Sequence, residues 1–84
     1  MKETEYKEKI IKLSDENKIT DEEFWVLIGL NIAKEDETEI RIIAKMLDNT
    51  ILRLKQQKKY SEAFKEEYKQ FSKILDLTEI GITI

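Results

Sequence analysis

The sequence predicts an all-α protein, a small bundle of three to four helices with an extended C-terminal tail. Isoleucine and leucine recur at spacings of three and four residues along most of the chain, which is typical of helices that bury one face. Two of these stretches follow residues that favour the start of a helix. The chain has no cysteine for disulfides, so its stability must come from packed helices, an oligomer or a partner.

The length of 84 residues fits one domain over residues 1–84, because a second hydrophobic core would need more chain. Residues 1–5 carry charge from the start and contain no apolar segment of signal-peptide length. The longest apolar run, residues 24–30, is far shorter than the roughly 20 residues that cross a bilayer. We therefore expect a cytoplasmic protein with no membrane contact.

The first helix is expected over residues 3–16. Tyr6, Ile10 and Leu13 lie about one helical turn apart and form a narrow apolar stripe. Asn17 follows this stripe, and asparagine readily adopts the left-handed conformation that ends helices. The sequence therefore predicts that this helix ends just before Asn17.

The second helix has the clearest start signal in the chain. Thr20 is a good N-cap residue, and Glu23 three residues later completes a capping box. Ile19 and Phe24 flank this box in the positions of a hydrophobic staple. These signals predict a helix that begins at Thr20.

Residues 24–33 are apolar on almost every side, which indicates a central buried helix or one whose second face meets a partner. Val26, Leu30 and Ala33 lie about one turn apart and are expected to share that second face. The protein would then either form a homodimer or expose an apolar patch. Gly29 costs helix stability and is best tolerated where a neighbouring backbone or large ring packs closely.

Asp36 and Glu39 repeat the capping pattern and are expected to open a third helix. Two apolar stripes follow, separated by polar residues: Ile40, Ile43, Leu47, Ile51 and Leu54, and then Tyr60, Phe64, Tyr68, Phe71 and Leu75. They form either a hairpin with a tight turn or one long helix over residues 36–76. We favour the hairpin, because a small monomer cannot bury both halves of a straight rod about 60 Å long. An obligate dimer would favour the long helix.

The tail changes its pattern, because Ile80, Ile82 and Ile84 alternate with other residues as they would in a strand. We therefore expect residues 78–84 to be extended.

The absence of histidine and cysteine excludes most of the common catalytic arrangements. Triads built on these residues, the usual zinc sites and thiol redox chemistry all need at least one of them. Neighbouring carboxylates such as Glu66 and Glu67 point about 100° apart on a helix and do not face each other. We predict a protein that is not an enzyme, with no cofactor and no metal site.

Charge is distributed unevenly along the chain. Residues 15–39 carry a net charge of −7, from nine acids against two lysines, whereas residues 40–59 carry +5, from six basic residues against one acid. The helix dipole stabilises acids at the start of a helix, but such acids also concentrate negative potential that attracts a basic partner. We predict that the acids form the partner-binding surface, with the only tryptophan as an apolar anchor: Asp21, Glu22, Trp25, Glu35, Asp36 and Glu37.

These observations predict a non-catalytic, acidic binding protein that regulates or inhibits a partner protein with a basic surface. Small acidic helical proteins of this kind resemble phage and mobile-element inhibitors in size and chemistry. A helical-bundle immunity protein or antitoxin is an alternative. A nucleic-acid-binding module is a further alternative, based on the basic residues between Arg53 and Lys59. No aromatic stacking pattern accompanies these residues, so nucleic acid is the less favoured partner.

Overall fold

A computed structural model of the chain describes residues 3–84 and is all-helical, as predicted. The described residues contain five helices rather than three or four: α1 (Glu3–Asp15), α2 (Asp21–Glu35), α3 (Ile40–Met46), α4 (Asp48–Gln57) and α5 (Glu62–Ser72). None of these helices is both long and apolar enough to cross a membrane.

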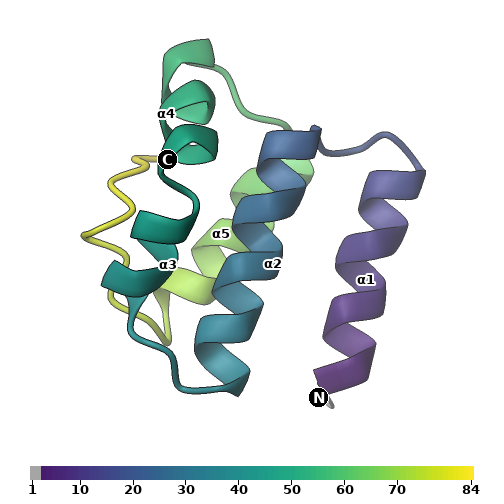
Figure 1. Cartoon of the computed structure of the whole chain (residues 1–84). Helices are drawn as coiled ribbons and strands as arrows, with labels where there is room; N and C mark the ends of the chain where they lie inside the picture. Colours follow the sequence, from purple (N-terminus) through teal and green to yellow (C-terminus); the bar gives the residue numbers. More distant parts are fainter. Residues whose placement is uncertain (1–2) are drawn as a thin grey trace.

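Helix α2 occupies the centre of the bundle and packs against each of the other four helices. Figure 1 shows α1 running antiparallel beside α2, with α3 on the opposite side of α2. The predicted capping box starts α2. The Thr20 hydroxyl accepts a hydrogen bond from the Glu23 amide at 3.2 Å, and the Glu23 carboxylate accepts one from the Thr20 amide at 2.8 Å. The predicted start of this helix is therefore confirmed.

Helix α1 ends close to the predicted position. Asn17 adopts a left-handed conformation with φ of 57°, and the Lys18 amide donates a hydrogen bond back to the Leu13 carbonyl. Tyr6 and Ile10 are buried against the rest of the core, as their spacing predicts.

The predicted helix start at Asp36 is wrong, because Asp36 ends α2. Its amide donates a hydrogen bond to the Ile32 carbonyl at 2.9 Å. Glu37 then has a φ of 54°, which interrupts the helix, and α3 begins at Ile40 without a side-chain cap from Glu39.

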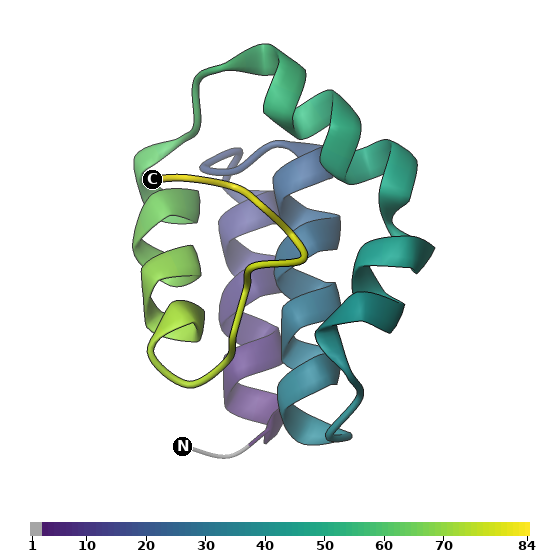
Figure 2. The same ribbon diagram turned by 90° about the vertical axis from the view of Figure 1, so that its left-hand side faces the viewer.

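The apolar stripe from Ile40 to Leu54 is divided at Leu47 into two helices. Leu47 has φ −104° and ψ 20°, and its amide still bonds to the Ile43 carbonyl. The change of direction between α3 and α4 is visible in Figure 2. With this bend, both Ile43 on α3 and Ile51 on α4 are buried.

Residues 36–76 do not form one long helix. Helix α4 ends at Gln57, Lys58 is left-handed with φ of 60°, and Ser61 caps α5 by accepting a hydrogen bond from the Phe64 amide. The favoured turn between the stripes is therefore present. However, α4 and α5 each pack on α2 rather than extensively on each other.

The C-terminal segment is not the extended tail that the sequence predicts. Residues 73–84 contain turns and no strand, and Gly81 adopts φ of 72°. Figure 2 shows this segment crossing the bundle between α5 and α3. Ile80 and Ile82 are buried in the core, whereas Ile84 is exposed. Ile80 and Ile82 thus contribute to the core from a segment without regular secondary structure.

The buried phenol of Tyr68 makes the fold sensitive to alkali. Burial raises its pKa to about 12 from an ordinary value of 10. The folded state therefore binds the phenol proton more tightly than the unfolded state does. The raised pKa contributes on the order of 2–3 kcal/mol to the free energy of unfolding. This contribution is fully present below pH 10 and is lost as pH rises from about 10 to 12.

We expect Tyr68→Phe to reduce this alkaline loss, as measured by urea unfolding at pH 8 and pH 11. At pH 8 the variant should be as stable as the parent or more stable. The reason is that the buried Tyr68 hydroxyl makes no well-formed hydrogen bond among the described residues, although the Ile82 backbone lies close enough to lower its pKa slightly. An equal alkaline loss in both proteins would contradict this assignment.

Candidate functional site

The outward face of α2 is apolar in its middle. Trp25 and Ile32 are separated by seven residues, two helical turns, and are 54% and 41% exposed. In contrast, Val26, Leu30 and Ala33 are all buried inside the protein. The prediction that these three share a second face, which a homodimer would cover or which would be exposed as a patch, is therefore wrong. An exposed apolar face is present, but it lies around Trp25 and Ile32.

Beside this face, an apolar groove of about 400 Å³ separates α2 from α3. Helices α2 and α3, their connection and the junction between α3 and α4 supply its lining: Trp25, Ile28, Gly29, Ile32, Thr38, Ile43, Met46 and Leu47. Met46 is 73% exposed, which is high for an apolar side chain. Tryptophan and methionine are both enriched in protein interfaces.

Gly29 brings the wall of this groove close to α2. A Cβ atom at this position would lie 2.7 Å from Leu47 Cδ1 and 2.9 Å from Ile43 Cγ2. The close neighbours are thus two aliphatic side chains, not the backbone or aromatic ring that the sequence suggested. A larger side chain here would push against α3 and change the shape of the groove.

The Trp25 ring is supported from within the bundle. It forms a T-shaped contact with the ring of Phe24, with centroids 5.2 Å apart and planes at 74°. Phe24 in turn packs against the hydrophobic core. This contact reduces the freedom of a half-exposed tryptophan, which lowers the entropy cost of placing it in an interface.

The predicted acidic residues lie at the two ends of α2. Asp21 and Glu22 are in its first turn, whereas Glu35, Asp36 and Glu37 are at its end. The rise of a helix separates these groups by about 20 Å. These acids therefore do not gather at two neighbouring helix starts, because Asp36 ends the helix that Asp21 begins.

Some of these acids are partly neutralised. Glu22 lies 3.7 Å from Arg53, and Glu35 lies 3.9 Å from Lys34. Among the described side chains, no basic group pairs with Asp21, Asp36 or Glu37. The negative charge therefore remains available at both ends of the apolar face.

The basic residues near the groove point elsewhere. Arg41 and Lys45 are four residues apart and share a face of α3 that differs from the face of Ile43 and Leu47. Arg53 leaves α4 towards Glu22, whereas the Lys55 ammonium approaches Gly81 of the C-terminal segment. Arg53 and Lys55 thus do not share one basic surface.

A second, more polar cleft of about 350 Å³ lies where α1 meets α5. Its floor holds Glu67, which is almost completely buried. The Glu67 carboxylate accepts a hydrogen bond from the Tyr6 hydroxyl at 2.8 Å and lies 3.0 Å from the Lys9 ammonium. Lys34 stands over the Tyr6 ring, 5.5 Å from its centre.

Sequence reasoning missed Glu67, although a signal was present. Glu67 lies three residues after Phe64 and four before Phe71, so it falls on the buried face of α5. A charged residue at such a position requires partners, which Tyr6 and Lys9 provide. One carboxylate oxygen of Glu67 bonds to Tyr6 and the other pairs with Lys9, so Glu67 links α5 to α1.

Within the part of the chain that the structure describes, no three carboxylates come together as a metal site would require. No protein-family model matches the sequence, and no curated protein or solved structure shows significant similarity to it. The geometry of the groove between α2 and α3 is therefore the main basis for a functional hypothesis.

Proposed function

We propose that this chain is a non-catalytic binding protein that regulates or inhibits a partner protein, of the kind found in phages and mobile elements. The groove between α2 and α3 docks the partner, and Trp25 is its principal anchor. The acids at the ends of α2 favour a partner with a basic surface, because complementary charge speeds association and selects among partners.

The observation that carries this proposal is the exposure of Trp25 beside an apolar groove. Small monomers rarely expose a tryptophan, an isoleucine and a methionine around one concavity without a use for them. Burial of such a tryptophan at the centre of an interface commonly contributes 2 kcal/mol or more.

Trp25→Ser tests the proposal, with Leu52→Ser as the matched control. Leu52 lies on α4, outside the groove lining, and is 53% exposed, which is nearly the exposure of Trp25. Each protein is used to capture partners from extracts of its native host, and binding of the purified partner is then measured by calorimetry. We expect Trp25→Ser to weaken binding about 30-fold and Leu52→Ser to change it less than two-fold.

Thermal unfolding should show a small loss of stability of similar size in both variants, because each side chain is only about half exposed. A partner that binds Trp25→Ser as tightly as the parent would contradict the role of the groove. A purified partner that proves to be nucleic acid, and that is lost in a Lys55→Glu/Lys58→Glu variant, would favour the nucleic-acid alternative.

A further inference from the structure

We propose that the groove receives an amphipathic α-helix of the partner, about four turns long, with apolar side chains in its middle and lysine or arginine at both ends. This inference rests on the proposed function, because it specifies the element that the same groove would bind. It follows from the chemistry of the groove lining, the shape of the walls and the position of the charges.

The lining favours a helix over an extended peptide. Seven of its eight residues are apolar or glycine, and Thr38 supplies the only side-chain hydroxyl. An extended peptide would bury amide and carbonyl groups there without partners, whereas a helix satisfies these groups internally. The described residues also contain no strand whose edge could pair with an extended peptide.

The walls have the shape that a third helix fills. Helices α2 and α3 border the groove, and a ridge of side chains from another helix packs into such a space. Trp25 and Ile32 lie two turns apart along one wall, and Met46 lies on the other. Apolar side chains at positions i, i+3 or i+4, and i+7 of the partner helix would match this length.

The charges define the ends of the partner helix. The acids at the two ends of α2 lie about 20 Å apart, which corresponds to roughly four turns of a bound helix. At the C-terminal end, Asp36 and Glu37 add to the negative pole of the α2 dipole. At the N-terminal end, the positive pole offsets part of the charge of Asp21. Basic residues should therefore matter most beside Asp36 and Glu37.

Two designed peptides test this inference. Both have 18 residues, lack tryptophan and carry the same leucine face, but one has lysines at its ends and the other has glutamates. Trp25 is the only tryptophan of the protein, so its fluorescence reports directly on the groove. We expect the lysine peptide to shift this emission and to bind at least 10-fold more tightly than the glutamate peptide at low salt. The difference should shrink as salt increases.

Charge reversals locate the effect. Asp36→Lys/Glu37→Lys should reduce the preference for the lysine peptide at least five-fold, and Asp21→Lys should reduce it less. A Glu8→Lys/Glu66→Lys variant is the control for net charge, because it also reverses two carboxylates that are exposed and lie outside the groove. It should leave the preference unchanged within two-fold. Circular dichroism should show the peptide gaining helix when it binds.

The other outcomes overturn the inference in distinguishable ways. Equal, salt-insensitive binding of both peptides would refute the charged ends but leave the apolar groove as a docking site. Equal binding of a proline-containing peptide with the same leucines would refute the helix. Concentration-dependent dimerisation that shifts Trp25 emission would identify a second copy of this chain as the occupant. If neither peptide binds while Trp25→Ser still loses the natural partner, only this inference fails; if the partner is also retained, the proposed function fails too.

Discussion

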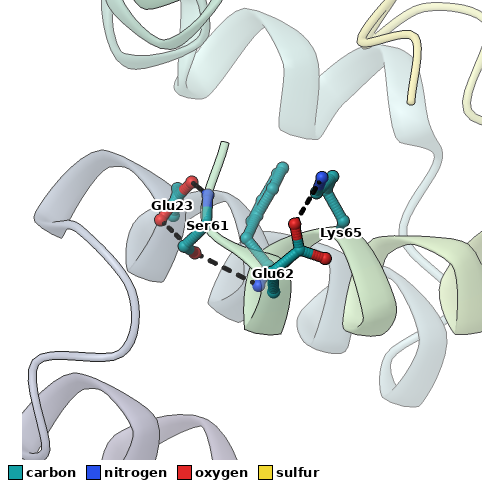
Figure 3. Close-up of polar contacts among 5 residues, drawn as sticks. Glu23, Ser61, Glu62 and Lys65 are labelled. Atoms are coloured by element: carbon teal, nitrogen blue, oxygen red, sulfur yellow. Dashed lines mark hydrogen bonds and ion pairs between the residues drawn. The ribbon is translucent and has the colours of Figure 1, made fainter. Parts of the chain in front are cut away.

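Glu23→Ala is expected to destabilise the protein by about 3–5 kcal/mol, a large part of the 5–15 kcal/mol typical of a small domain. Glu23 is completely buried at the start of α2. Its carboxylate accepts hydrogen bonds from the Thr20 amide at 2.8 Å, the Ser61 amide at 2.9 Å and the Ser61 hydroxyl at 2.8 Å. Figure 3 shows Glu23 facing Ser61 at the beginning of α5.

The large loss of stability in Glu23→Ala follows from the unpaired donors and the cavity that alanine would leave. Donors at the starts of both α2 and α5 would lose their acceptor, and a cavity would replace the carboxylate. Thr20→Ala removes only the hydroxyl that accepts from the Glu23 amide, so it should cost about 1 kcal/mol.

Urea unfolding of the two variants, with Glu22→Ala as the half-buried neighbour, measures these differences. Glu22→Ala should cost less than about 1 kcal/mol, from its partial ion pair and the helix dipole. A cost for Glu23→Ala no larger than that for Thr20→Ala would show that the link to Ser61 adds nothing to stability.

Glu67→Ala should give the second largest effect, about 2–4 kcal/mol. The substitution leaves the buried Tyr6 hydroxyl without its acceptor and removes this link between α1 and the middle of α5. Glu66→Ala is the matched control, because Glu66 is the adjacent carboxylate and is exposed; it should change stability by less than about 0.5 kcal/mol. Equal costs for the two alanine variants would contradict the role of Glu67.

Glu67→Gln separates the charge from the hydrogen bond. Burial raises the pKa of Tyr6 well above its ordinary value, and the hydrogen bond to Glu67 and its negative charge raise it further. Removing the charge should therefore lower the pKa of Tyr6, although burial keeps it elevated. Ultraviolet titration of the variant against the parent measures this shift, and an unchanged titration would contradict it.

Local signals predicted the parts of the fold that depend on neighbouring residues. The beginning of α2 depends on Thr20 and Glu23, and the end of α1 depends on Asn17; both were correct. The same kind of signal failed at Asp36, because an acid with a glutamate three residues later also occurs where a helix ends. The conformation of Glu37, which decides between these cases, leaves no pattern in the sequence.

The remaining errors concern contacts between distant residues. The stripe through Leu47 has unbroken helical spacing, so the bend that divides α3 from α4 is not visible in it. An all-round apolar helix does not reveal which face is covered, and the core covered Val26 and Leu30 while leaving Trp25 exposed. Trp25 was included among the predicted site residues, but the groove beside it depends on α3, which no local signal places.

The bond between Glu23 and Ser61 also has a topological consequence. It joins residues 38 positions apart and so ties the base of a chain loop that contains both α3 and α4. This link, together with the packing of α4 on α2, offsets part of the entropy cost of closing the loop. The wall of the groove can then accumulate substitutions at exposed positions such as Met46 with little effect on the framework. Substitutions there would change the lining of the groove while keeping the same scaffold.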